Sequence, residues 1–354
     1  MRILVTGGAG FIGSAVVRRL ISESDYEVFC IDKMTYAATR ESIESVIGND
    51  SFELKICDIA SNSSVSQCLE AFQPDKILHL AAESHVDRSI EDPDAFIESN
   101  IIGTYVLLSE SLKYWESMSK DRRDEFRFHH VSTDEVFGDL SLNDPPFSES
   151  TKYDTSSPYS ASKASADHLV RAWHRTYGLP IVITNCSNNY GPFQFPEKLI
   201  PLAFTKALIG QQIPIYGKGD QIRDWLYVED HVDALIKAML FGKNGECYNI
   251  GGNCEKTNLE VIRTLCQIMD EIVETPPNGI SKFEELITFV KDRPGHDVRY
   301  AINSKKIERE LNWQPKEDLY SGLRKTLCWY LENREWLNKI NNKKYDGSRI
   351  GLEK

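Results

Sequence analysis

Short runs of apolar residues alternate with longer amphipathic segments along the first half of the chain. The runs are continuous rather than alternating, which is typical of strands that are buried on both faces of a sheet. The segments between them carry apolar residues at helical spacing, so they predict helices that cover such a sheet. The expected strands are 3–6, 27–32, 52–58, 76–82, 126–133 and 181–187, and the expected helices are 11–21, 98–115 and 158–177.

This βαβ pattern predicts an α/β fold of the Rossmann type, a doubly wound parallel sheet with ligands at the carboxyl ends of its strands. After residue 187 the rhythm loosens, and prolines interrupt the chain at 192, 196, 201, 214 and 294. We therefore expect a nucleotide-binding domain in residues 1–187 and a smaller mixed substrate lobe in residues 188–354. Two later segments, 232–241 and 259–273, have helical patterns, so parts of the second half are expected to rejoin the main sheet.

Composition and charge exclude several classes of protein. Of the 354 residues, 41% are hydrophobic and 27% are charged, as in soluble globular proteins. The net charge of -12 argues against a nucleic-acid partner, because recognition of a phosphate backbone needs a basic face. No stretch approaches the roughly 18 apolar residues of a membrane span, and no signal segment precedes the first strand. We expect a cytoplasmic protein without a membrane partner.

Eight cysteines raise the question of disulfides or a metal site. No two of them form a C-x-x-C motif, and several lie in apolar runs that predict strands or helices. We interpret them as reduced and mostly buried thiols, which behave as small apolar side chains. The sequence therefore predicts neither a disulfide framework nor a metal site.

A glycine-rich loop separates the first expected strand from its helix. Gly7, Gly10 and Gly13 have G-x-x-G-x-x-G spacing, which lets the backbone approach a pyrophosphate at the positive end of the helix. Asp32 ends the second strand, where a carboxylate binds ribose hydroxyls and repels a 2'-phosphate, so the sequence favours NAD over NADP. Lys33 follows it and could attract a 2'-phosphate, which leaves NADP open as the alternative.

Tyr159 and Lys163 lie one turn apart in an expected helix, directly after Pro158, which suits a first helical turn. A lysine ammonium stabilises a phenolate, so the pair predicts a tyrosine base with a lowered pKa. The same lysine can bind the nicotinamide ribose. Such pairs are common on helices by chance, but the glycine loop and Thr133 at a strand end make this one a predicted nicotinamide site.

Two adjacent carboxylates, Asp134 and Glu135, follow Thr133 directly. An arbitrary acidic pair after a strand is more often a solvated turn. This pair, however, lies between the glycine loop and Tyr159, and redox chemistry at a nicotinamide does not need two further proton carriers. The pair therefore predicts a second reaction, such as the loss of water.

Longer runs extend these motifs over nearly the whole chain. They are DKMTYA (32–37), HLAAESHVDRS (79–89), STDEVFGD (132–139), YSASK (159–163), TNCSNNYGP (184–192), FPEKLIP (195–201), RDW (223–225) and DRPGHD (292–297). By these runs the chain resembles the extended short-chain dehydrogenases/reductases, and among them the dTDP-glucose 4,6-dehydratase family. It differs from the family pattern at Met34, at Phe137 and in residues 37–39, and none of these differences removes a catalytic group.

The resemblance implies a catalytic set and a division of labour. Tyr159 would deprotonate the hydroxyl on sugar carbon 4 as hydride passes to NAD, with Lys163 beside it. Glu135 would remove the proton on carbon 5, and Asp134 would protonate the departing hydroxyl of carbon 6. Thr133 would hydrogen-bond near the carbon 4 oxygen. The hydride then returns to carbon 6, so the resemblance implies that NAD is not consumed overall.

The resemblance also implies two sets of binding residues. The implied cofactor-binding residues are Gly7, Gly10, Phe11, Ile12, Gly13, Asp32, Lys33, Met34, Thr35, Asp58, Ile59, Leu80, Ala81, Ala82, Ser84, Ser99, Tyr159, Lys163 and Asn189. The implied residues for a nucleotide-sugar substrate, dTDP-glucose, are Glu83, Thr133, Asn188, Lys198, Leu199, Pro214, Ile215, Tyr216, Arg223, Asn258, Arg293 and His296. From local sequence alone, Asp58 and Ile59 are equally well explained as turn and core residues, and Tyr216 as a core residue.

Several alternatives stay open. A nucleotide-sugar 4-epimerase shares the glycine loop and the Tyr/Lys pair but does not need Asp134 and Glu135. A UDP-glucose 4,6-dehydratase also stays open, because the ring methyl that separates thymine from uracil is worth only about 1–3 kcal/mol in a hydrophobic pocket. A catalytically silent NAD-sensing scaffold would tolerate loss of Tyr159. The resemblance also implies a homodimer formed by the helices 98–115 and 158–177.

Overall fold

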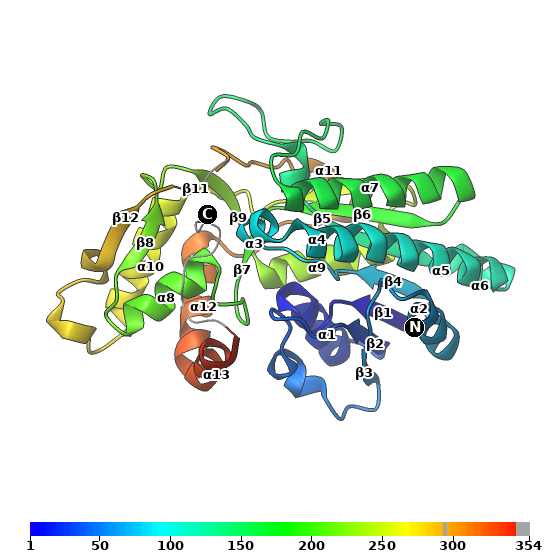
Figure 1. Ribbon diagram of the computed structural model, residues 1–354, viewed down its shortest axis with the longest axis horizontal. Helices are drawn as coiled ribbons and strands as arrows, with labels where there is room; N and C mark the ends of the chain where they lie inside the picture. The colour runs from blue at the N-terminus through cyan, green and yellow to red at the C-terminus, as the bar shows by residue number, and fades with distance from the viewer. Residues whose placement is uncertain (293–295, 345–354) are drawn as a thin grey trace.

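A seven-stranded parallel sheet forms the centre of the computed structural model, which describes residues 1–292 and 296–344 (Figure 1). Its strand order is β10-β6-β5-β4-β1-β2-β3, and every neighbouring pair is parallel. The strands are β1 (Arg2–Thr6), β2 (Glu27–Asp32), β3 (Phe52–Ile56), β4 (Lys76–His79), β5 (Arg127–Thr133), β6 (Ile181–Cys186) and β10 (Cys247–Ile250). This order confirms the predicted doubly wound sheet of the Rossmann type.

Helices cover both faces of this sheet, which explains why its strands are apolar without alternation. Ile3 and Val5 of β1 belong to the core on one face, whereas Leu4 between them belongs to the core on the other. The covering helices are α1 (Phe11–Glu23) and α9 (Val228–Phe241) on the first face, and α2 (Asn62–Phe72), α5 (Thr104–Ser117) and α7 (Pro158–Tyr177) on the second. The helices α5 and α7 run side by side (Figure 1).

A second lobe lies beside this layered domain and has an apolar core of its own (Figure 1). Its strands form a three-stranded sheet, β11-β9-β7, and a two-stranded sheet, β12-β8. These strands are β7 (Asn188–Tyr190), β8 (Ile213–Tyr216), β9 (Ile222–Tyr227), β11 (Glu255–Thr257) and β12 (Ile287–Val290). The helices that pack on them are α8 (Leu199–Leu208), α10 (Asn258–Ile272), α12 (Leu319–Glu332) and α13 (Arg334–Lys344).

The chain passes between the two lobes more than once. After β9 it enters α9 and then β10, which pairs with β6 at the edge of the main sheet, before β11 returns to the second lobe. The loops that join the lobes therefore gather near the carboxyl ends of the main strands. In a doubly wound sheet this edge forms the ligand crevice.

The helix expected at 98–115 has two parts, a π-helical turn and then α5. Within the turn, Asn100 is buried and exchanges hydrogen bonds with the backbone of Glu83, while Gly103 packs so closely on Ile59 that a Cβ would lie 2.7 Å from it. Such π-helical turns are frequent at functional sites. This turn is η2 (Ile97–Gly103).

The other short elements are η1 (Arg40–Val46), α3 (Val86–Glu91), α4 (Pro93–Phe96), α6 (Lys120–Glu125), η3 (Asp134–Phe137), η4 (Pro277–Gly279), η5 (Phe283–Leu286) and α11 (Lys305–Leu311). No described helix has the length and apolar character needed to cross a bilayer.

Candidate active site

The glycine loop after β1 is packed tightly on one side and open on the other. A Cβ on Gly7 would lie 2.7 Å from the Cα of Ala81, and a Cβ on Gly13 would lie 2.1 Å from the carbonyl oxygen of Gly7. A Cβ on Gly10, by contrast, would lie 3.4 Å from that carbonyl, and Gly10 is the N-cap of α1 without a side-chain hydrogen bond. The first N–H groups of α1 are thus left to a ligand, at the helix end that attracts anions.

The carboxylate of Asp32 is fixed at the end of β2 by two backbone donors. Oδ2 accepts from the N–H of Ala9 at 2.9 Å, and Oδ1 accepts from the N–H of Met34 at 2.7 Å. Beside it, Lys33 forms an ion pair of 2.5 Å with Asp58. Burial would raise the pKa of Asp58, but the hydrogen bond and charge of Lys33, together with the N–H of Ala60, outweigh burial and lower it. The charge of Lys33 is therefore partly neutralised, which weakens the argument that Lys33 attracts the 2'-phosphate of NADP.

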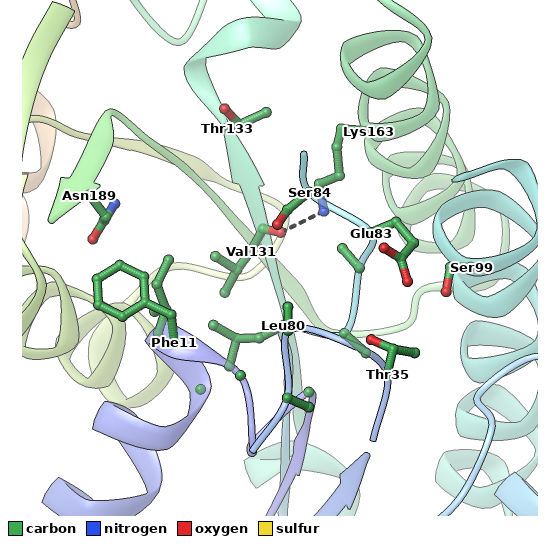
Figure 2. A pocket seen from close by; sticks show the side chains of 18 of the residues that line it. Phe11, Thr35, Leu80, Glu83, Ser84, Ser99, Val131, Thr133, Lys163 and Asn189 are labelled. Carbon is green, nitrogen blue, oxygen red and sulfur yellow. Dashed lines mark hydrogen bonds between the residues drawn. The ribbon is translucent and has the colours of Figure 1, made fainter. Parts of the chain in front are cut away.

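One cavity brings together most of the residues expected to bind the cofactor (Figure 2). The expected residues that line it are Gly7, Gly10, Phe11, Ile12, Gly13, Asp32, Lys33, Thr35, Asp58, Ile59, Leu80, Ala81, Ala82, Ser84, Ser99, Tyr159, Lys163 and Asn189. Met34 is placed differently. Its side chain packs against the core of the main domain, and its backbone adopts a positive φ of 57° that directs its N–H to Asp32.

Lys163 and Tyr159 are positioned by the first turns of α7, which begins with a capping box at Ser157. The amine of Lys163 donates to the carbonyl of Val131 over 2.8 Å (Figure 2). Burial lowers the pKa of Lys163. Burial, reinforced by the negative charge of Glu135, raises the pKa of Tyr159 well above its ordinary value. The expectation of a lowered pKa for Tyr159 beside Lys163 was therefore wrong for the chain itself, because burial dominates.

Thr133, Asp134 and Glu135 lie together where β5 ends and a single 3-10 turn begins. The hydroxyl of Thr133 donates to Oδ1 of Asp134 at 3.3 Å and accepts from the N–H of Glu135 at 3.3 Å. Asp134 is 1% exposed, and among the described residues its Oδ2 has no hydrogen-bond partner. Burial, reinforced by Glu135 and Asp224, raises the pKa of Asp134 well above the usual carboxyl range. The pair thus combines a carboxyl group whose protonated form is favoured with a second carboxyl group.

A second cavity of about 460 Å³ adjoins the first on the side of the second lobe. The expected substrate residues that line it are Asn188, Lys198, Leu199, Pro214, Tyr216, Arg223, Asn258 and His296, while Glu83 and Thr133 line the first cavity. Ile215 is placed differently, because successive residues of β8 point to opposite faces and its side chain lies in the core of the second lobe. Arg293 lies outside the described residues.

The two cavities meet at a seam of shared residues. These are Ser84, Glu135, Asn188, Asn189, Gln194, Glu197 and Lys198. Glu135 therefore faces both cavities, as a group that acts on a ligand held between them must. Sequence reasoning missed Gln194 and Glu197. Gln194 lies between the matched runs 184–192 and 195–201, and Glu197 lies within the second run. A buried glutamate in a loop gives no local signal, since its partners come from distant segments.

The comparisons with known proteins agree with this geometry. A family model described as GDP-mannose 4,6 dehydratase matches residues 4–326. A dTDP-glucose 4,6-dehydratase of Escherichia coli is 54% identical over 360 residues and 99% of each chain is covered. The enzyme of the same name from Salmonella typhimurium (strain LT2) is 56% identical over 353 residues, which cover 98% of this chain and 97% of the relative.

Among solved structures, the dTDP-glucose 4,6-dehydratase DesIV of Streptomyces venezuelae, with NAD and TYD bound, has a TM-score of 0.86 and 40% identity. The match covers 96% of this chain and 100% of that one. The sheet, the glycine loop and the Tyr159/Lys163 pair define a short-chain dehydrogenase/reductase. The chain belongs to the dTDP-glucose 4,6-dehydratase family within that class.

Proposed function

We propose that the protein dehydrates dTDP-glucose to dTDP-4-keto-6-deoxyglucose, with NAD as its cofactor, as a hydro-lyase of deoxysugar biosynthesis. The observation that carries the proposal is the buried Asp134. Its raised pKa, and an Oδ2 that has no hydrogen-bond partner within residues 1–292 and 296–344, suit it to donate a proton. Family membership and relatives of that name at 54–56% identity over nearly the whole chain support the same activity.

The first cavity fits NAD. The uncapped start of α1 at Gly10 suits a pyrophosphate, and the carboxylate of Asp32 at the end of β2 suits the ribose hydroxyls. Asp58 and Ile59 would flank the adenine, and Tyr159 and Lys163 would hold the nicotinamide end. Bound NAD supplies a hydride acceptor for carbon 4 that later serves as the hydride donor to carbon 6, and its positive charge favours ionisation of a nearby phenol.

Three side chains carry the protons of the reaction. Tyr159 takes the proton from the hydroxyl on carbon 4, which becomes a ketone and acidifies the proton on carbon 5. Glu135, at the seam of the two cavities, removes that proton. Asp134 protonates the hydroxyl that leaves carbon 6, so the sugar loses one water across carbons 5 and 6. A proton then returns to carbon 5 as carbon 6 receives hydride.

The second cavity fits a nucleoside diphosphate. Lys198 and Arg223 supply cationic donors for phosphate oxygens in a protein of net charge -12. Tyr216 and Leu199 offer apolar surface for a base, and Glu83 and Thr133 border the sugar side. Arg223 is itself held by the carbonyl of Asp297 at 2.9 Å and lies over the ring of Tyr300 at 4.3 Å.

The experiment that tests the proposal is incubation of the purified protein with dTDP-glucose and, separately, with UDP-glucose. We expect a 4-keto-6-deoxy product from dTDP-glucose, faster than from UDP-glucose, and no accumulation of NADH with turnover. A product that kept its hydroxyl on carbon 6 with the configuration at carbon 4 inverted would favour a 4-epimerase instead. Binding of NAD without any turnover of either sugar would favour the scaffold alternative.

Partner and location follow from other observations. Helices η2, α5 and α7 carry apolar side chains that are nearly half exposed, among them Ile97, Tyr105 and Tyr177, which suits an isologous four-helix interface between two copies of the chain. All eight cysteines are free. Free thiols are typical of a reducing compartment, which supports a cytoplasmic location that cell fractionation can test.

A further inference from the structure

Glu197 is a buried carboxylate at the seam of the two cavities. Its side chain is 2% exposed, yet it borders both cavities. Oε2 accepts a hydrogen bond from Nε of Arg88 at 3.0 Å, and Oε1 accepts one from the hydroxyl of Tyr36 at 3.1 Å. A buried charge is costly unless such partners satisfy it, so the cluster of Tyr36, Arg88 and Glu197 is a built arrangement.

The three members of this cluster come from three separate segments around the site. Tyr36 belongs to the loop after β2, whose neighbours Thr35 and Ala37 line the cofactor cavity. Arg88 belongs to α3, and Glu197 precedes α8 in the second lobe. The guanidinium of Arg88 also lies over the ring of Tyr36 at 3.8 Å, a cation–π contact. The cluster therefore joins the nucleotide-binding domain to the second lobe.

The protonation states favour these contacts. Burial would lower the pKa of Arg88, but Glu197 and Tyr36 outweigh burial and raise it. Burial, together with Glu197, raises the pKa of Tyr36 above its ordinary value, so Tyr36 stays a phenol that donates a hydrogen bond to Glu197. Arg88 is thus a cation, and Tyr36 a neutral donor, throughout the neutral pH range.

The cluster also fixes the turn that carries Lys198. The ring of Phe195 stands edge-on to Tyr36 with centroids 5.5 Å apart, and the N–H of Lys198 donates to the carbonyl of Phe195 at 3.1 Å. At the end of the turn, the amine of Lys198 lies 3.2 Å from the carbonyl of Ser84, across the seam. Phe195 and Glu197 of the turn therefore both contact Tyr36. The ammonium group of Lys198 faces the seam where the two cavities meet.

We infer that Glu197 is a positioning residue for the substrate nucleotide: its clamp on Tyr36 and Arg88 holds the turn 195–198 so that Lys198 meets the diphosphate. The inference rests on the proposed function, because it takes the second cavity as the site of a nucleoside diphosphate. In this role Glu197 takes no proton of the reaction and acts through Lys198. Its loss should therefore weaken nucleotide binding through Lys198 rather than slow proton transfer.

A double-mutant cycle measured by titration calorimetry tests this, with dTDP added to the NAD-bound protein. Glu197→Gln keeps the shape but removes the charge, and we expect it to weaken dTDP binding about tenfold or more, as loss of hydrogen bonds to a charged group does. In a Lys198→Met background the same substitution should weaken binding by no more than about twofold, because the two residues act as one unit.

Two further variants make the test specific. Glu229→Gln is the matched control, because Glu229 pairs with Arg19 at 2.8 Å and borders neither cavity, so dTDP binding should stay unchanged. Tyr36→Phe keeps the ring but removes one hydrogen bond to Glu197, and it should give a smaller loss that also disappears in the Lys198→Met background. Tyr36→Phe takes the place of Glu197→Gln in the cycle if Glu197→Gln does not fold.

Two results would overturn the inference. One is dTDP affinity equal to the wild type in both Glu197→Gln and Tyr36→Phe. The other is an equal loss of affinity with and without Lys198, which would mean that Glu197 acts through general packing. A wild-type protein that bound no dTDP at all would instead overturn the proposed function, and the inference would fall with it.

Discussion

The hydroxyl of Thr133 donates to Oδ1 of Asp134 over 3.3 Å, while Oδ2 of the same carboxyl group has no hydrogen-bond partner among the described residues. One oxygen is thus held in place and the other is left for a ligand. Because burial raises the pKa of this group well above the usual carboxyl range, the protonated form of Asp134 is favoured. This arrangement differs from a solvated acidic turn, in which both oxygens would be hydrated and ionised.

Replacement of Asp134 by asparagine should separate oxidation from dehydration. The amide keeps the hydrogen bond geometry but cannot give a proton to the hydroxyl that leaves carbon 6. We expect formation of the 4-keto product to fall about a hundred- to ten-thousandfold, as is usual when a general acid is removed. Product analysis together with the absorbance of bound NADH measures the two steps, and an equal loss of both would count against this role.

The dehydration step should slow at high pH. Asp134 acts in its protonated form, so the step weakens as pH rises through its raised pKa. Oxidation at carbon 4 should not weaken over the same range, because Tyr159 gains its basic form as pH rises. Single-turnover rates measured across pH separate the two, and Asp134→Asn should lack the alkaline decline. A decline that persisted in this variant would assign it to another group.

The fold was predictable from the sequence mainly where strands are buried on both faces. Residues 27–32 and 158–177 were predicted with the bounds that the structure has, because a continuous apolar strand and a proline-initiated amphipathic helix leave strong patterns. The segment 62–72 was not predicted as a helix, and β8 was not recognised as a strand. The strand β8 has only four residues, one of them a proline, and α2 opens with the polar residues 62–64, so neither has a strong local pattern.

The site was predictable as far as it consists of residues in motifs. The misplacement of Ile215 follows from missing β8, since strand alternation would have assigned it to the core. The sign of the pKa shift of Tyr159 depends on burial by the folded chain, which no local pattern contains. Glu197 was missed for the same reason, because its partners Tyr36 and Arg88 are distant in sequence.

The exposed apolar side chains of α5 and α7 predict a homodimer. Tyr105 is 46% exposed and Tyr177 is 49% exposed, and both contact Trp173. Light scattering at micromolar protein should give twice the chain mass for the wild type and the monomer mass for Tyr105→Glu, because the interface would bury the new charge. Leu142→Glu, at a site that is 64% exposed outside these helices, should leave the dimer intact. A monomeric wild type would contradict the prediction.

Acid should destabilise the protein through its buried histidines. The ring of His231 is fully buried, its Nδ1 lies 2.9 Å from Oδ1 of Asn189, and burial lowers its pKa to about 3. Below about pH 6.5 the unfolded chain binds a proton that the folded chain refuses, so stability is lost as pH falls below this value. The loss between pH 7 and 5 is about 2 kcal/mol for this group.

Urea unfolding at the two pH values checks this effect. His231→Gln removes the titration, so the variant should lose about 2 kcal/mol less than the wild type between pH 7 and 5, whatever its stability at pH 7. Other buried histidines contribute equally to both proteins, and the difference isolates His231. An identical loss in the two proteins would show that His231 keeps an ordinary pKa when folded.

The central claim, that oxidation and elimination use separate proton carriers, is tested most directly by single-turnover measurements with dTDP-glucose in deuterated water. The readouts are the absorbance of bound NADH and deuterium at carbon 5, in Tyr159→Phe and Glu135→Gln. We predict little NADH in Tyr159→Phe, because oxidation itself fails. We predict bound NADH but poor exchange at carbon 5 in Glu135→Gln, because an amide is a far weaker base than a carboxylate. Near-wild-type dehydration by Glu135→Gln and Asp134→Asn would contradict the account and return the epimerase interpretation.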